Sequence, residues 1–288
     1  MQKTTLGGAV GAILAVISSG AWAACSDVSV DQLTQAIQAA NSAGSGPWSD
    51  PTTGGYGLPM WATIVDETGM VCQVQTSGYW GGNAGNQEWL GSRVISAQKA
   101  NTANAFSTDY YAISTANLYS AAQPGGGFYG LQHSNPVDAS TAYLGSPAQY
   151  GLIDQGKSMD PLVGRRIGGI NVFAGGLALY KFDKSNNSYK KIGALGVSGD
   201  TACRDHAYAW RIREALRMHA GGNGITTANY DADGAGQTPL VPKGLKGDEM
   251  IIVNKASNNY WNTWSHPACP DSTKAITRAN GTLKVPYK

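Results

Sequence analysis

The stretch that decides the fold is IGALGVSGDTACRDHAYAWRIREAL, residues 192–216. Its first six residues are mostly apolar, which predicts a short strand. The strand leads through Ser198-Gly199-Asp200 into a region where apolar residues recur at helical spacing, so Thr201–Met218 is predicted to be a long helix. Asp200 or Thr201 is a natural N-cap for it. One strand and one helix are therefore expected to be joined by a tight, glycine-containing turn.

The rest of the chain supplies further strands and helices around this unit. Leu58–Asp66 and Met70–Thr76 are strand-like runs joined by a short turn, which predicts a hairpin. Further strands are expected at 167–173 and 177–182, and helices at 30–43, 92–106 and 117–123. This order predicts an α/β chain of the α+β kind, an antiparallel sheet with helices packed on it.

The N-terminus reads as a secretory signal peptide covering residues 1–23. Lys3 gives a positive start, Leu6–Ile17 is apolar, and Ala21-Trp22-Ala23 fits the small-residue rule for cleavage before Ala24. The apolar run is shorter than the roughly 20 residues that cross a bilayer, so no membrane span is expected. A periplasmic or secreted protein is predicted.

The composition limits the kinds of partner that the protein is expected to bind. The chain has 288 residues, a formal net charge of +2 and only 14% charged residues. Nucleic-acid binding would leave a basic stripe, and the sequence has none. The mature chain is divided here into a domain at 24–218 and an extension at 219–288, which is expected to pack on the core.

Four cysteines follow the predicted cleavage site, at positions 25, 72, 203 and 269. In an oxidising compartment they suggest two disulfides, with three possible pairings. We expect Cys203–Cys269 to attach the extension to the last core helix, which leaves Cys25–Cys72. There is no C-x-x-C-H motif, so covalent c-type haem attachment is not expected.

Four segments in this order resemble the GlcG/HbpS haem-binding family, which includes the C-terminal domain of PduO-type proteins. They are LPMWATIVDETGMVCQVQTSG, SAQKANTANAF, INVFAGGLALY and residues 192–216. The resemblance covers about 30–216. It implies a five-stranded antiparallel sheet flanked by helices, somewhat like profilin or PAS domains. It also implies homo-oligomers and non-covalent binding of haem, taken here as haem b, for haem handling or redox sensing.

Two positions depart from the family pattern. In the PduO-type branch the axial histidine lies on the first helix, but the predicted helix at 30–43 contains no histidine. The residue after Asp205 is usually acidic, whereas here it is His206. The resemblance therefore supports the expected fold more strongly than it supports the family's mode of haem ligation.

The loop AAQPGGGFYGLQHSNPVD, residues 121–138, is the main candidate for a ligand site. Its glycines, Gly126 among them, let the backbone approach a ligand or another element closely. Phe128 and Tyr129 supply ring surface, and His133 is a candidate axial ligand for haem iron. The loop has no P-loop lysine. The alternative is a glycine-rich turn in which His133 hydrogen-bonds to backbone.

Other candidates lie on the two long helices. Lys99 and Phe106 belong to the helix at 92–106, where Lys99 could contact a propionate or an acidic substrate, or lie along a packed surface. Ser198, Gly199 and Asp200 are a candidate anion site at a helix N-terminus, or a cap alone. His206 is expected to be a surface histidine, and His219 and His266 are given no ligand role.

Three functions follow from these candidates. The first is an exported protein that binds haem or another small ligand without a covalent bond, between the sheet, the helix at 92–106 and the loop at 124–133. The second is a periplasmic enzyme that acts on a small organic acid or an aromatic substrate. The third is a structural partner of a periplasmic dehydrogenase or transport system.

Overall fold

The computed structural model describes residues 23–42, 58–78, 85–86, 88–89, 91–218, 248, 250 and 264–267. The predicted signal peptide therefore lies outside the described residues, apart from Ala23. In the described ranges no helix has both the length and the apolar character that a membrane crossing requires.

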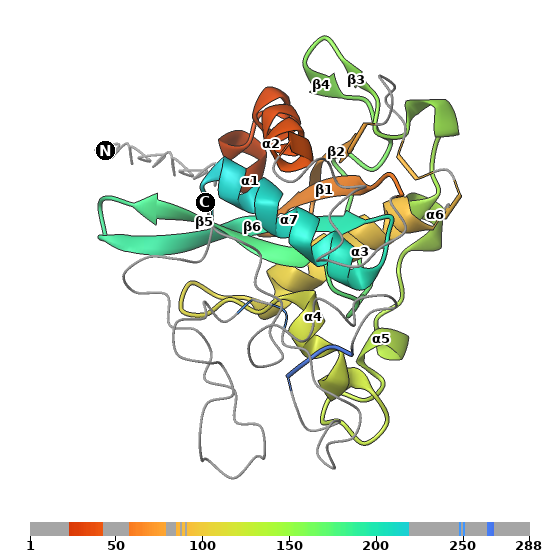
Figure 1. The fold of residues 1–288 in the computed structure, drawn as a ribbon, viewed down its shortest axis with the longest axis vertical. Helices are drawn as coiled ribbons and strands as arrows, with labels where there is room; N and C mark the ends of the chain where they lie inside the picture. The colour runs from red at the N-terminus through yellow and green to blue at the C-terminus, as the bar shows by residue number, and fades with distance from the viewer. Residues whose placement is uncertain are drawn as a thin grey trace, which may run out of the picture.

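A four-stranded antiparallel sheet forms the centre of the fold (Figure 1). Its strand order is β2-β1-β6-β5. The strands are β1 (Trp61–Asp66), β2 (Val71–Thr76), β5 (Gly176–Asp183) and β6 (Ser188–Ser198). Two short strands, β3 (Ile153–Asp154) and β4 (Lys157–Ser158), pair separately. The antiparallel sheet and the β1–β2 hairpin are confirmed, but the expected five-stranded sheet is wrong by one strand.

The missing strand is the run at 167–173. Gly168 and Gly169 have φ angles of 63° and 82°, in the left-handed region, so the chain cannot stay extended through them. Gly168 forms only an isolated bridge with Val137. The apolar residues of this run are still buried, with Ile167 at 2% and Val172 at 1% exposure. Burial without pairing explains why its composition resembles that of a strand.

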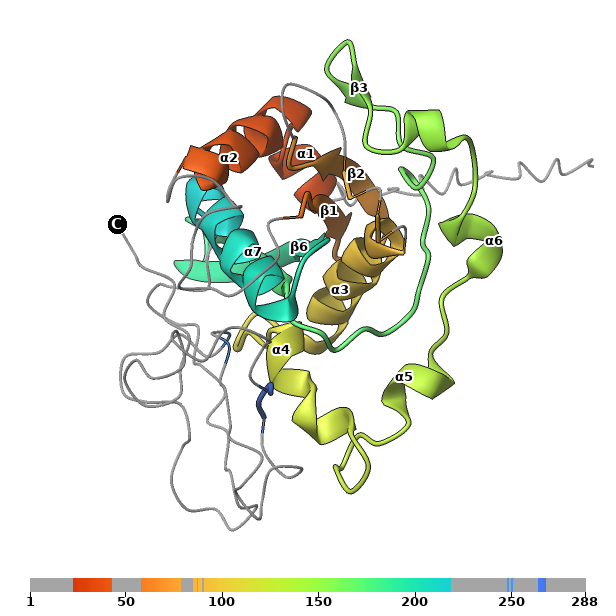
Figure 2. The same ribbon diagram turned by 45° about the vertical axis from the view of Figure 1, so that its right-hand side comes forward.

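Helices cover both faces of the sheet (Figures 1 and 2). On one face α2 (Val30–Ser42) and α7 (Ala202–Leu216) pack together and on the strands, beside the short α1 (Ala23–Asp27). On the other face lies α3 (Ser92–Phe106), which contacts β1, β5 and β6. Alternate residues of each strand point to opposite faces, so Leu195 joins the α2–α7 cluster and Ala194 joins the α3 cluster.

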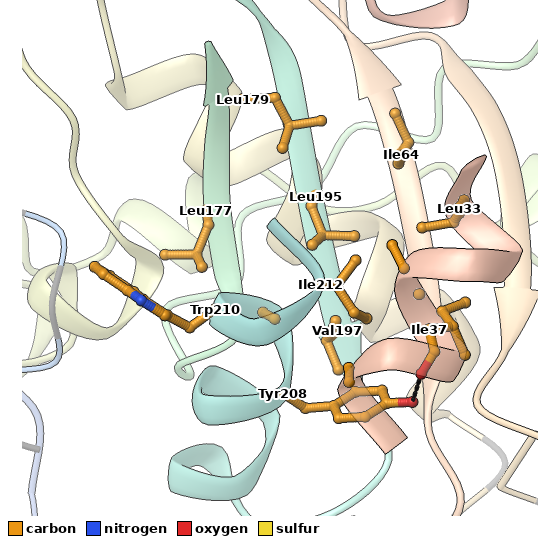
Figure 3. Close-up of a cluster of buried hydrophobic side chains, with 14 of the residues drawn as sticks. Leu33, Ile37, Ile64, Leu177, Leu179, Leu195, Val197, Tyr208, Trp210 and Ile212 are labelled. Atoms are coloured by element: carbon orange, nitrogen blue, oxygen red, sulfur yellow. Dashed lines mark hydrogen bonds between the residues drawn. The ribbon is translucent and has the colours of Figure 1, made fainter. Parts of the chain in front are cut away.

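The α2–α7 face holds the larger of these two clusters (Figure 3). Leu33 and Ile37 of α2 meet Tyr208 and Ile212 of α7 above the strand side chains. The Tyr208 hydroxyl donates to the side-chain oxygen of Asn41 at 2.5 Å and lies 3.4 Å from the backbone carbonyl of Ile37. A buried phenol that finds an acceptor in this way lets an aromatic ring fill the core without leaving a polar group unsatisfied.

Between α3 and β5 the chain forms a long excursion along one side of the molecule (Figure 2). It contains α4 (Thr115–Leu118), η1 (Ser120–Ala122), α5 (Leu131–Ser134), α6 (Ala139–Ala142), η2 (Pro147–Gln149) and β3–β4. Arg93 of α3 anchors it through a buried ion pair with Asp160, where Arg93 Nε lies 2.9 Å from Asp160 Oδ2. The Arg93 guanidinium also stacks on the ring of Tyr150, 3.5 Å from its centroid.

The helix α3 lies unusually close to the sheet. A Cβ atom added to Gly196 of β6 would lie 1.9 Å from the carbonyl oxygen of Ser96, and one added to Gly176 of β5 would lie 2.4 Å from that of Lys99. The facing side chains of α3 are small, with Ala97 and Ala100 fully buried. The hydroxyls of Thr63 and Ser96 also bond across this contact at 2.6 Å. Glycine is therefore required on the strands at both positions.

The predicted disulfide between Cys25 and Cys72 is confirmed. It joins α1 to β2, with the two Cα atoms 4.9 Å apart. Cys203 is also disulfide-bonded, but its predicted partner Cys269 lies outside the described residues.

The close contact between α3 and β6 predicts a large effect of one methyl group. Gly196→Ala should lower the free energy of unfolding by about 3 kcal/mol, because the new Cβ overlaps the backbone of α3. Gly127→Ala is the matched control, since a Cβ there meets nothing within 4 Å; it should change stability by less than about 0.5 kcal/mol. Urea unfolding of both variants measures the difference, and equal stabilities would show that α3 does not lie this close.

Candidate functional site

Lys99 lies at the point where α3, the end of β6 and the start of α7 meet. Its side chain is buried, and Nζ donates to Val197 O at 3.0 Å, to Ser198 Oγ at 3.3 Å and to Asp205 Oδ2 at 2.7 Å. An ammonium has three donors, so all of them are used. Contact with a propionate or an acidic substrate would therefore require Lys99 to give up a bond within the protein.

The N-terminus of α7 is occupied by the protein's own acceptors. Thr201 caps the helix, accepting from the backbone N–H of Arg204 at 3.3 Å. The Asp200 carboxylate accepts from the backbone N–H groups of Leu58 and Thr201 at 3.0 and 2.6 Å. The Asp205 carboxylate accepts from the N–H of Asp200 at 2.9 Å. Two carboxylates thus stand where the positive end of the helix dipole would attract an external anion.

The other two residues of the candidate anion site are also engaged. Ser198 accepts from Lys99, and the Gly199 carbonyl accepts from the side-chain amide of Asn86. Gly199 has a φ of 152°, and a Cβ on it would lie 2.3 Å from Pro59 O. Anion binding at residues 198–200 stays a prediction, and what the structure shows there is a cap.

Burial sets the electrostatics of the Lys99–Asp205 pair. It raises the pKa of Asp205 to about 6, although Lys99 and the N–H of Asp200 both favour the carboxylate. It also lowers the pKa of Lys99, against the attraction of Asp205. Both shifts have the same origin, because desolvation penalises each charged form. The pair is therefore a costly arrangement that depends on both partners being present.

A second group of candidate residues forms an aromatic patch, defined here as Phe106, Phe128 and Trp264. The ring centroids of Phe106 and Phe128 are 6.2 Å apart, and those of Phe128 and Trp264 are 5.4 Å apart, edge to face. Phe128 is 37% exposed and the neighbouring Tyr129 is 63% exposed. The patch brings together the end of α3, the glycine loop and a segment far along the chain, and leaves ring surface open to solvent.

The glycine loop turns toward its own chain. A Cβ on Gly126 would lie 2.2 Å from the carbonyl oxygen of Ala121, and that carbonyl accepts from the N–H of Phe128 at 2.8 Å. The close approach that Gly126 permits is therefore to η1. This turn sets the position of Phe128 within the patch, and any contact of Gly126 with a ligand stays a prediction.

His133 lies on α5, just beyond the patch in sequence. It is exposed, and its backbone N–H donates to Gly130 O at 3.0 Å. Within the described part of the chain its ring makes no hydrogen bond, so the alternative of an imidazole bonded to backbone is not observed. The structure thus separates two groups. Lys99 lies with Ser198 in the core, whereas Phe106, Phe128 and His133 belong to the surface around the glycine loop.

Comparison with known proteins bears on the family. A family model described as "Haem degrading protein HbpS-like" matches residues 39–214, more than half of the chain. The chain belongs to the HbpS-like family. The segments that suggested the resemblance all lie wholly or largely within this match.

Two solved structures are similar to this HbpS-like chain. The Klebsiella pneumoniae protein ORFY is 20% identical, and the match covers 67% of this chain and 89% of that one with a TM-score of 0.38. The PduOC protein in its haem complex is 22% identical, with 66% and 92% coverage and the same TM-score of 0.38. The comparison with curated proteins found no match to this HbpS-like chain.

Two buried histidines of this HbpS-like protein were not anticipated. His206 of α7 is fully buried, so the expectation of a surface histidine is wrong. His266 is 3% exposed and packs on the ring of Tyr119, 4.9 Å between centroids. Burial lowers the pKa of His206 to about 3 and that of His266 to about 4. The position of His206, one turn before the buried Trp210, was a usable signal.

The described side chains do not by themselves form a metal-binding cluster. Across the residues that the structure describes, no three or more His, Cys, Asp or Glu side chains gather so as to hold a metal ion. A single exposed imidazole such as His133 is nevertheless enough for one axial bond to haem iron, since the porphyrin supplies the other ligands.

Removing Lys99 tests the buried pair. Lys99→Met should lower the free energy of unfolding by about 3–5 kcal/mol at pH 7.5, because it leaves the Asp205 carboxylate buried without a cation. Lys190→Met is the control: its pair with Asp109 spans 2.9 Å, but the lysine side chain is 49% exposed. That change should cost about 1 kcal/mol or less. Similar losses in the two variants would contradict the buried arrangement.

Proposed function

We propose that this protein is exported and binds haem without a covalent bond, as a haem-handling or redox-sensing member of its family. The observation that carries the proposal is the exposed aromatic patch, with an exposed histidine five residues after Phe128 whose ring makes no hydrogen bond within the described residues, in a chain whose family is described by haem chemistry. The PduOC protein, a similar chain, is known in a complex with haem. Support for the site itself comes from the chain's own residues.

The patch suits a planar apolar ligand. Phe128 is held between Phe106 and Trp264 and still leaves 37% of its surface open. Covering such rings with a flat macrocycle removes apolar surface from water on both partners, at about 25 cal/mol per Å². The exposed ring of Tyr129 next in sequence extends the available surface. Most of the binding free energy would come from this burial.

His133 would supply the axial bond and fix the orientation of the ligand. Its imidazole follows Phe128 by five residues, on α5, and makes no competing hydrogen bond within the described residues. A neutral imidazole nitrogen is a common haem ligand. Bound haem iron supplies redox chemistry, while the protein's rings would exclude water from one face of the ligand. Phe128 and Trp264 would thereby protect the axial bond from competition by solvent.

Export is supported by two features of the chain. The N-terminal sequence has the three parts of a secretory signal. The disulfide between Cys25 and Cys72 belongs to an oxidising compartment, because thiols are kept reduced in the cytosol. We propose a periplasmic or secreted protein on these grounds.

A haemin titration tests the proposal. Wild-type protein should give a sharpened Soret band with stoichiometric haemin. His133→Ala should lose or shift that band, and Phe128→Ala should weaken binding by about tenfold, as expected for the loss of roughly 1.4 kcal/mol of ring contact. Gln132→Ala and Tyr143→Ala, which change a neighbour of His133 and an exposed ring that directly follows α6, should behave as wild type.

The outcomes separate the alternatives. A wild type that does not perturb the haemin spectrum contradicts haem binding. A colourless organic anion that copurifies with the protein would favour the periplasmic enzyme. Normal haemin affinity in His133→Ala with an unchanged spectrum would keep haem binding but exclude His133 as the ligand.

A further inference from the structure

Residues Trp264–Pro267, named here the strap, lie against the segment that contains α4 and η1, and their first residue, Trp264, belongs to the aromatic patch. Ser265 O accepts from the backbone N–H of Ser120 at 3.0 Å and from its hydroxyl at 2.9 Å, and the two serine hydroxyls are also 2.9 Å apart. The Trp264 ring packs on Phe128. His266 packs on the ring of Tyr119, so these three strap residues each contact the segment 119–128.

The third contact of the strap is a buried imidazole that has no place for a second proton. His266 Nδ1 lies 2.7 Å from the carbonyl oxygen of Pro267, so the single proton of the neutral ring belongs on Nδ1. His266 Nε2 is buried without a hydrogen-bond partner, and the ring lies on Tyr119. Protonation would create a charged N–H donor with no acceptor, which is strongly unfavourable in a buried position.

A second buried histidine, on α7, has the same property. His206 is fully buried, and neither of its ring nitrogens has a hydrogen-bond partner. Its nearest ring neighbour is Trp210, with centroids 6.0 Å apart. His206 and His266 are close enough for a charge on one to disfavour a charge on the other.

The charged groups around the two rings also oppose their protonation. Lys99 of α3 acts on both histidines, and Arg213 of α7 acts on His206. The carboxylates that face these cations are already used: Asp205 pairs with Lys99, and Asp248 pairs with Arg213. Neither carboxylate is hydrogen-bonded to an imidazole nitrogen. Two protonated rings would therefore meet two fixed positive charges without a counter-ion of their own.

We propose that the strap is an acid-released cover, in which protonation of His206 and His266 drives Trp264–Pro267 off α4 and η1. Release uncovers the rings of Phe128 and Tyr119, on which Trp264 and His266 pack. The structure at neutral pH is then the closed form of the patch. The proposal stands apart from haem binding, because neither its trigger nor its test involves haem.

The direction and the range of the effect follow from the histidines. Their ordinary pKa is 6.5, and in the closed form burial lowers the pKa of His266 to about 4 and of His206 to about 3. The stability of the closed form relative to the released form is greatest above about pH 6.5. It decreases as the pH falls toward 4, because the released form then binds more protons. The pKa of Asp205, about 6, means that it also loses the charge that offsets Lys99 within this range.

Hydrogen–deuterium exchange of the full mature chain tests the proposal. Protection factors, corrected for the intrinsic pH dependence of exchange, are compared at pH 7.0 and pH 4.5 for peptides spanning 115–122 and 264–267. We expect both peptides to lose protection at pH 4.5, by on the order of 50-fold where one of the two histidines is protonated on release and by on the order of 10³-fold where both are. Peptides of α3, residues 92–106, should stay protected within threefold.

Variants identify the trigger. His266→Gln should reduce the acid effect, and His206→Asn combined with His266→Gln should abolish it, since neither amide titrates. His133→Gln, which changes an exposed histidine, should keep the wild-type response. Wild-type protection that is unchanged at pH 4.5 overturns the proposal without any variant. Equal loss in α3 also overturns it, because that result means global unfolding, and so does a full response in the double variant.

Discussion

The contact between α3 and the sheet is the constraint on which the rest of the structure depends. Gly176 and Gly196 have no side chain where the backbone of α3 passes. The carbonyl groups of Ser96 and Lys99 therefore lie so close to the strands that a Cβ atom would not fit between them. A helix held at this distance can place a lysine amine across the end of β6 and reach the start of α7. Helix, strand and second helix are thus tied at one buried point, and neither glycine can be replaced without moving α3.

The buried Lys99–Asp205 pair follows from that contact and divides the molecule into two functional regions. Because the Asp205 carboxylate accepts from the Lys99 ammonium and from the N–H of Asp200, both of these donors at the α7 terminus already have a partner within the protein. Surface chemistry is displaced to the other end of α3, where Phe106 meets Phe128. Phe128 and His133, which we propose contact the ligand, are carried by the excursion between α3 and β5.

Much of this could be predicted from local sequence. The helix at Ser92–Phe106 has the predicted bounds, and the β1–β2 hairpin and α7 follow their periodicity. The prediction of a strand at 167–173 was wrong because the apolar residues of this run are buried, whereas the left-handed angles of Gly168 and Gly169 interrupt the extended chain and leave a single isolated bridge. The aromatic patch was predicted in part. The glycine loop singled out Phe128, but the local sequence gives no sign of a partner such as Trp264, more than a hundred residues later.

The histidines show why burial is harder to predict than secondary structure. His206 lies on a helix that also carries several charged residues, and it directly follows Asp205, so its complete burial is not evident from the local sequence. The segment Trp264–Pro267 puts a second uncharged imidazole on Tyr119 and an indole on Phe128. The hydrogen bonds and ring contacts described for this segment are between uncharged groups, so they favour the closed form most while its histidines stay neutral. Its closure is therefore conditional on pH in a way that an apolar residue at position 266 would not allow.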